Sequence, residues 1–186
     1  VSFPGLRPVP FQKPHPPLLR ACLSLDSTKE MAQIRRPILI GAQDNESIAE
    51  RITLYREELE SSSLSEVEVT SLLDQIWVSK DVLVGEDSLE TVETAREGYI
   101  TEQAHFREAR ERFNPTGNSS KKTGTEEFKA TFIAGTPAEV SDQIEELRHL
   151  GVRNLMMKMN TGEMKKNIVR NSIHLFAKEV MPKFSA

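Results

Sequence analysis

The sequence predicts an α/β fold built on a parallel sheet. Short apolar runs typical of buried strands alternate with segments whose apolar residues recur every three or four positions, as in amphipathic helices. Strand–helix–strand connections of this kind join parallel strands through right-handed crossovers. Four such units in 186 residues would form a small open sheet or half of an eight-stranded barrel, and periodicity alone does not choose between them.

The first unit begins with a stiffened approach to a strand. Residues 9–18 are expected to be extended, because each proline fixes its own φ and disfavours helix in the residue before it. The prolines are Pro8, Pro10, Pro14, Pro16 and Pro17. Residues 18–25, LLRACLSL, predict a first strand, and residues 26–33 a short helix with Asp26 as its N-cap. The continuous apolar run of residues 36–42, RPILIGA, predicts a second strand covered on both faces.

A helix, a strand and a long helix follow. Asp44 can cap the first of these helices, which the serine cluster at residues 61–65 ends. Its apolar stripe consists of Ile48, Ile52, Tyr55 and Leu59. Residues 75–85, QIWVSKDVLVG, predict the third strand, and Asp87 with Glu90 resembles a capping box for the long helix.

The last part of the chain contains a loop, a helix, a strand and a helix. Residues 114–125, NPTGNSSKKTGT, contain no apolar residue, and we expect a flexible loop around residues 114–131. In GTPAEV, Thr136 and Glu139 predict a capping box at a helix start. Residues 152–159 predict the fourth strand, and residues 163–184 a final amphipathic helix.

Composition excludes several classes of protein. The net charge of −4 argues against a nucleic-acid partner or an anionic membrane surface, because there is no basic excess to neutralise phosphates. A single cysteine, Cys22, excludes an internal disulfide framework and favours the cytoplasm. No apolar run approaches the roughly 20 residues that span a bilayer. The chain starts without a signal-peptide pattern and without Met, so we expect a fragment of a longer protein.

No metal or nucleophile site is evident. The histidines are scattered without a second ligand at metal spacing: His15, His105, His149 and His174. Cys22 is expected to be a small core residue. Core positions are also predicted for Trp77, Met156, Met157 and Met159. The polar strand ends Gly41–Gln43, Ser79–Lys80 and Lys158–Asn160 fit a site or the sheet rim equally well.

Three segments together resemble the C-terminal half of a known enzyme family. These are PFQKPHPPLLRACLS near the start, AGTPAEVSDQIEELRHLGVRNLMMKM further on, and SIHLFAKEVMPKF near the end. Their order and spacing are similar to those of luciferase-like flavin-dependent monooxygenases (bacterial luciferase-like), from about Pro8 to Phe184. The resemblance implies a TIM (β/α)8 barrel that binds reduced FMN, or a deazaflavin in one branch. Residues 1–186 would form the C-terminal half of one barrel domain, with its fifth to eighth strands.

The resemblance places the flavin phosphate at the turn after the first predicted strand. The matching residues are Leu23, Ser24, Ser27 and Thr28. Hydroxyls and free N–H groups at a strand's carboxyl end and a helix N-terminus suit a phosphate. The usual sequence of the family at this turn differs from this chain at Leu23, Leu25 and Asp26. The negative charge of Asp26 disfavours a phosphate beside it. The alternative interpretation is a plain capped turn.

The flexible segment matches the family's active-site lid in position. Arg112, Lys121 and Lys122 could steer an anionic flavin or close over it. The alternative is a solvated linker whose lysines serve solubility.

Three functions remain open at this stage. The first is a monooxygenase that uses reduced FMN and O2 on a small organic substrate, with a flavin reductase as a possible source of reduced flavin. The second is a deazaflavin-dependent oxidoreductase on the same fold, and the third a truncated, non-catalytic flavin-binding or assembly protein. The resemblance implies that the catalytic residues lie in the first half of the barrel, so none is assigned here and this chain alone is expected to be inactive. It also implies a homo-oligomer for the complete protein.

Overall fold

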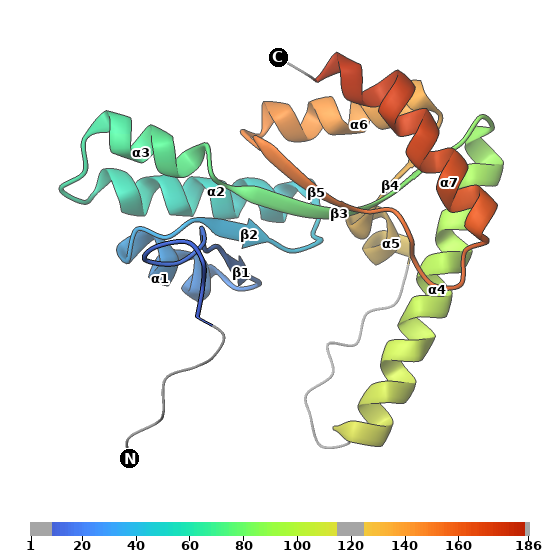
Figure 1. The fold of residues 1–186 in the computed structure, drawn as a ribbon, viewed down its shortest axis with the longest axis horizontal. Helices are drawn as coiled ribbons and strands as arrows, with labels where there is room; N and C mark the ends of the chain where they lie inside the picture. Colours follow the sequence, from blue (N-terminus) through green and yellow to red (C-terminus); the bar gives the residue numbers. More distant parts are fainter. Residues whose placement is uncertain (1–8, 115–124, 185–186) are drawn as a thin grey trace.

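The computed structural model describes residues 9–114 and 125–184. In this part of the chain the strands are β1 (Arg20–Cys22), β2 (Ile38–Ile40), β3 (Trp77–Val84), β4 (Phe132–Gly135) and β5 (Asn154–Lys158). The helices are α1 (Leu25–Gln33), α2 (Asn45–Glu60), α3 (Glu66–Leu73), α4 (Ser88–Phe113), α5 (Thr125–Thr131), α6 (Pro137–His149) and α7 (Lys166–Leu175). A π-helical turn η1 (Phe176–Val180) and a 3-10 turn η2 (Met181–Lys183) end the described chain. Figure 1 shows their order.

Every strand pair in the described residues is parallel, as the alternation of strands and helices predicts. β1 pairs with β2, and β2 pairs with the start of β3 at Trp77 and Val78. β5 pairs with Trp77 to Asp81 of β3, while β4 pairs from Asp81 onward. Asp81 therefore has β5 on one side and β4 on the other. The path across the sheet is β1-β2-β3-β5, and β4 lies beside the far end of β3.

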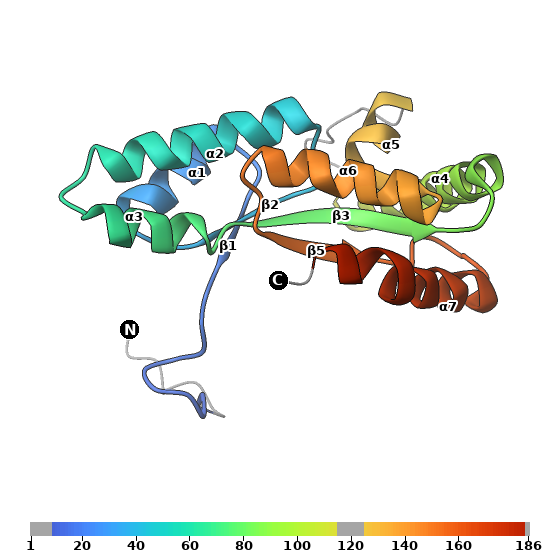
Figure 2. The same ribbon diagram turned by 90° about the horizontal axis from the view of Figure 1, so that it is seen from above.

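The two faces of the sheet differ in their cover. One face supplies a continuous hydrophobic core to α1, α2, α3, α6 and η1. Its buried strand members are Cys22, Ile38, Ile40, Val78, Val82, Val84 and Ile133. Seen from above, α2 and α6 run along the same side of β3 (Figure 2). A second, smaller cluster lies at the far end of β3 and β4, where Tyr99 of α4 packs edge-on against Phe132.

The opposite face is only partly covered. We define the open face by the strand residues that alternate with the core positions: Ala21, Leu39, Trp77, Ser79, Asp81, Met156 and Lys158. Trp77 is 37% exposed and Met156 is 44% exposed, so the prediction that both are core residues was wrong. A strand's alternation places them on this face, and no helix of the described chain packs over them to exclude water.

Several element predictions need correction. The first helix is capped by Ser24 and not by Asp26, because the hydroxyls of Ser24 and Ser27 close a capping box that starts two residues earlier. Residues 125–131, expected to belong to a loop, form α5. Helix α3 and strand β4 were not predicted. Lys121 and Lys122 lie outside the described residues.

None of the helices in the described ranges is long and apolar enough to cross a membrane.

Candidate functional site

The β1–α1 turn places the predicted phosphate residues at the carboxyl end of a strand. The backbone N–H of Ser27 donates to Ser24 Oγ at 3.2 Å, and the hydroxyl of Ser27 lies 2.8 Å from the Ser24 carbonyl oxygen, to which it donates. These two hydroxyl oxygens are 3.1 Å apart. The first-turn N–H groups of Leu25 and Asp26 precede the first intrahelical bond, which Thr28 donates to Ser24, so they can serve an outside acceptor.

The four predicted phosphate-binding residues differ in their exposure to solvent and therefore in whether a ligand can reach them. The side chain of Leu23 is 71% exposed and Ser24 is exposed, whereas Ser27 is half-buried. Thr28 is fully buried and its hydroxyl donates to the Ser24 carbonyl at 3.1 Å. The structure thus brings Ser24 and Ser27 together at the surface and gives Thr28 a role inside the turn.

Two residues outside this turn hold its backbone, and sequence reasoning missed one of them. Arg51 of α2 is 8% exposed and donates from Nη2 to the carbonyl of Leu23 at 3.0 Å and from Nη1 to that of Ser47 at 2.8 Å. Gln43 Nε2 donates to the same Leu23 carbonyl at 3.4 Å. The buried Nε of Arg51 has no acceptor among the described residues. Arg51 could have been suspected only as a cation on the apolar stripe of α2, three residues after Ile48.

Lys80 is the second cation in this region. It lies in β3 on the core side of the sheet and is 3% exposed. Its Nζ donates to the carbonyls of Gln43 at 2.5 Å and Ala130 at 2.6 Å. Burial lowers the pKa of Lys80 to about 8, and the carboxylate of Asp44 acts in the opposite direction. Lys80 therefore ties the β2–α2 turn to α5, and Gln43 links that turn to Leu23.

This donor set fits a phosphate group. Two backbone N–H groups and the positive end of α1 converge at this turn with two hydroxyls, each of which would turn its hydrogen from an acceptor inside the turn to the phosphate. Asp26 is the one unfavourable group, since its carboxylate lies in the first turn of α1. Its side chain is exposed, where water screens it.

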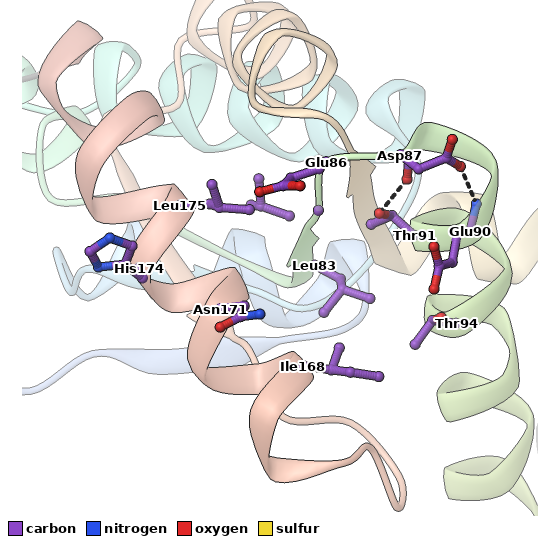
Figure 3. Close-up of a pocket in the computed structure, with 12 residues that line it drawn as sticks. Leu83, Glu86, Asp87, Glu90, Thr91, Thr94, Ile168, Asn171, His174 and Leu175 are labelled. Carbon is purple, nitrogen blue, oxygen red and sulfur yellow. Dashed lines mark hydrogen bonds between the residues drawn. The ribbon is translucent and has the colours of Figure 1, made fainter.

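A second hollow lies at the carboxyl end of β3, between the β3–α4 turn and α7 (Figure 3). Its volume is about 470 Å3. The side chains of Leu83 and Ile168 point into it, while Glu86, Asp87 and Glu90 supply three carboxylates. Asp87 caps α4 by accepting from the Glu90 N–H at 2.8 Å. This concentration of negative charge disfavours a phosphate, so the β1–α1 turn is the better phosphate site of the two.

An ion pair between a buried carboxylate and a partly exposed lysine lies on the open face. Asp81 is 5% exposed, and its Oδ2 is 3.1 Å from Nζ of Lys158, which also reaches Glu102 Oε2 at 2.7 Å. Burial raises the pKa of Asp81, and Lys158 works against that rise. The sequence contained both residues in predicted strands without indicating that they meet.

The predicted lid residue Arg112 is not brought to the phosphate turn. It lies in the last turn of α4, with its guanidinium 5.1 Å from the centre of the Phe113 ring. Figure 1 shows this end of α4 projecting away from the sheet. The lid stays a prediction. In the described part of the chain, no group of three or more His, Cys, Asp or Glu side chains is arranged to hold a metal ion.

The parallel sheet, with helices packed against one of its faces, defines a parallel α/β fold of the barrel type. The family model of luciferase-like monooxygenases matches residues 2–154, and the chain belongs to this family. No curated protein shows a significant sequence match.

Solved structures with the same fold include three named enzymes. Monooxygenase RslO1 from Streptomyces bottropensis matches at 19% identity with a TM-score of 0.66, over 94% of this chain and 50% of that one. The oxygenating constituent of 3,6-diketocamphane monooxygenase from Pseudomonas putida, in complex with FMN, matches at 17% identity and 0.65, over 92% and 50%. Coenzyme F420-dependent tetrahydromethanopterin reductase from Methanopyrus kandleri matches at 19% and 0.56, over 91% and 51%. The likeness establishes the fold, and this chain spans about half the length of each.

Proposed function

We propose that this chain contributes the flavin-phosphate half of a monooxygenase that uses reduced FMN and O2 to oxygenate a small organic substrate. The observation that carries the proposal is the β1–α1 turn, where Ser24 and Ser27 present hydroxyls beside the free N–H groups of α1. Membership of the luciferase-like monooxygenase family and the FMN-bound structure of similar fold support it.

In this proposal the chain binds and orients the cofactor. Ser24 and Ser27 hold the phosphate, while Arg51 and Gln43 fix the Leu23 carbonyl and thereby the position of the turn. The flavin supplies the redox chemistry when bound. The catalytic residues belong to the other half of the barrel, a flavin reductase is a possible source of reduced FMN, and the complete protein is a homo-oligomer in the cytoplasm.

A deazaflavin-dependent oxidoreductase is the second candidate. Two structures of similar fold are F420-dependent enzymes: the Methanopyrus kandleri reductase and a secondary alcohol dehydrogenase in complex with an F420–acetone adduct. Fluorescence titration with FMN and with F420 separates the two, because the proposed function requires the tighter binding to be that of FMN. A non-catalytic flavin-binding role would give FMN binding without substrate oxidation once the complete barrel is assembled.

The decisive experiment compares FMN with riboflavin, which lacks the phosphate. In the variant with Ser24→Ala and Ser27→Ala, FMN affinity should fall at least about tenfold, since a hydrogen bond to a charged group contributes about 1.5–3 kcal/mol. Riboflavin affinity should stay unchanged. The double variant also loses its capping box, which costs about 1 kcal/mol of stability.

Ser65→Ala is the matched control. Ser65 caps α3 through the same kind of box, with Glu68, so its loss weakens a helix start without touching the phosphate turn. FMN affinity should be unaffected there. Equal losses for FMN and riboflavin, or an FMN affinity unchanged in a folded double variant, would contradict the assignment.

A further inference from the structure

Arg51 carries a buried positive charge directly behind the β1–α1 turn. It is 8% exposed and belongs to the buried side of α2. Its Nη2 donates to the carbonyl of Leu23 at 3.0 Å, and its Nη1 donates to the carbonyl of Ser47 at 2.8 Å. Among the described residues its ion-pair partner is Glu50, whose Oε2 lies 3.9 Å from Nη1 and whose side chain is 59% exposed. The guanidinium is therefore hydrogen-bonded but only weakly neutralised.

The hydrogen bond to Leu23 orients the peptide group that opens the turn. The N–H of a trans peptide points away from its C=O, so a Leu23 carbonyl held against Arg51 directs the Ser24 N–H to the opposite side. There the Ser24 N–H donates to Ser27 Oγ at 3.3 Å. A carbonyl oxygen repels a phosphate, and this orientation turns that oxygen toward the protein interior and away from the ligand side of the turn.

Orienting this peptide does not by itself require a cation. Gln43 also donates a hydrogen bond to the Leu23 carbonyl, from a neutral amide, and burial of a charge is unfavourable unless an opposite charge compensates it. The buried Nε of Arg51 and the buried Oε1 of Gln43 both lack a hydrogen-bond partner among the described residues. Unsatisfied buried groups in a folded protein call for an explanation. A negatively charged ligand at the turn would supply the compensation that the guanidinium lacks.

The other charged and titratable groups around the turn leave its potential positive. Asp26 opposes the guanidinium from the first turn of α1, but its side chain is exposed to solvent. Asp44 caps α2, and the backbone N–H that it accepts at 2.7 Å lowers its pKa. Lys80 adds a second buried cation at the β2–α2 turn. Burial raises the pKa of Cys22, so its thiol stays neutral.

We propose that Arg51 is a positioning residue that makes the β1–α1 turn select a phosphate dianion over an uncharged group. It acts through the Leu23 carbonyl and through its electrostatic field, which is strong because the charge is buried. This inference rests on the proposed function, since it requires the flavin phosphate to bind at Ser24 and Ser27. Arg51 lies outside that pair of hydroxyls, so the two proposals can be tested separately.

Fluorescence titration of the 186-residue chain with FMN and with riboflavin measures this selectivity. At pH 7, Arg51→Met should weaken FMN binding about tenfold, because a buried charge close to the phosphate is lost. Riboflavin affinity should stay unchanged. Arg51→Lys keeps the charge and should restore most of the preference for FMN. Arg56→Met is the matched control, because it removes the same charge from the exposed side of the same helix. Circular dichroism checks that each variant is folded.

The pH profile separates the role of the charge from a structural role. A phosphomonoester gains its second negative charge near pH 6. The ratio of FMN affinity to riboflavin affinity should therefore rise between pH 5 and pH 7, and Arg51→Met should flatten this rise. A variant that only distorts the turn weakens both charge states of the phosphate alike and leaves the shape of the profile unchanged. Riboflavin, measured over the same range, reports any titration of the protein itself.

Three outcomes would overturn the role of Arg51. These are equal losses of FMN and riboflavin binding in folded Arg51→Met, no recovery in Arg51→Lys, and a pH profile that Arg51→Met does not flatten. If FMN binding is nevertheless lost selectively in the variant with Ser24→Ala and Ser27→Ala, the proposed function stands and only the role of Arg51 fails. If that double variant binds FMN normally, the phosphate does not bind at this turn and both proposals fail.

Discussion

Removal of the Lys158 ammonium should lower the free energy of unfolding, because it leaves the buried Asp81 carboxylate without a counter-charge. The side chain of Asp81 is 7% exposed, and Lys158 Nζ lies 3.1 Å from it. Breaking a buried ion pair by deleting one partner typically costs about 3–5 kcal/mol. Because the side chain of Lys158 is itself 43% exposed, water can replace part of its effect, and we expect about 2 kcal/mol for Lys158→Met.

Urea unfolding, followed by the fluorescence of the only tryptophan, Trp77, measures this loss. With a denaturant dependence of about 2 kcal/mol per molar for a domain of this size, the midpoint should fall by about 1 M. Asp81→Asn combined with Lys158→Met should recover most of the loss, since no uncompensated charge then remains buried. All samples are compared at one protein concentration.

The stability lost in Lys158→Met should depend on pH, because the pKa of Asp81 differs between the folded and unfolded states. Burial holds the pKa of Asp81 above its ordinary value of 3.8, so between these two pKa values the folded protein binds more protons than the unfolded chain. Stability in that window rises as pH falls. Without Lys158 the pKa of Asp81 rises further, so the deficit of Lys158→Met should be largest near pH 7 and shrink toward acid.

Lys129→Met is the control for this experiment. Lys129 and Glu126 form an ion pair at 3.6 Å whose side chains are 66% and 90% exposed. Such a surface pair contributes at most about 0.5–1 kcal/mol. If Lys158→Met is no more destabilising than Lys129→Met, or if the double variant is as unstable as the single one, the reasoning about Asp81 is refuted.

Three further predictions concern the packing around the site. The pKa of Lys80 is about 8 in the folded protein against an ordinary 10.5, so between these pH values the unfolded chain holds the extra proton and the contribution of Lys80 to stability rises with pH. In urea unfolding from pH 7 to 10, Lys80→Met should remove this rise. An unchanged pH profile would argue against burial of the charge. Gly98→Ala places a Cβ 2.8 Å from the carbonyl oxygen of Thr161 and should cost about 2 kcal/mol, visible as a lower melting temperature; no change would mean that the two segments separate easily. Tyr55→Phe removes the hydroxyl that donates to the carbonyl of Arg36 at 2.8 Å and should cost about 1 kcal/mol in urea unfolding, whereas a more stable variant would show that this bond contributes nothing.

The sequence by itself determined the class of fold and most of its elements, though not α3, α5 or β4, because the signals for the predicted elements are local. The apolar stripe of α2, the Asp87 cap of α4 and the Thr136–Glu139 box of α6 each involve residues within a few positions of one another. Alternating strands and helices then left a parallel sheet as the consistent arrangement, and the resemblance to luciferase-like enzymes located the polar turn at Ser24.

Only the tertiary structure decided what surrounds that turn and which side of the sheet is covered. Arg51 reaches Leu23 across 28 residues and Lys80 reaches Ala130 across 50, contacts that no periodicity encodes. Strand β4 is four residues long and is recognisable by its pairing with β3. The position of Trp77 in a predicted strand favours a core residue, yet burial requires a covering element from elsewhere in the chain. The described chain supplies that element on one face, because its helices pack there, and leaves Trp77 and Met156 on the other face exposed.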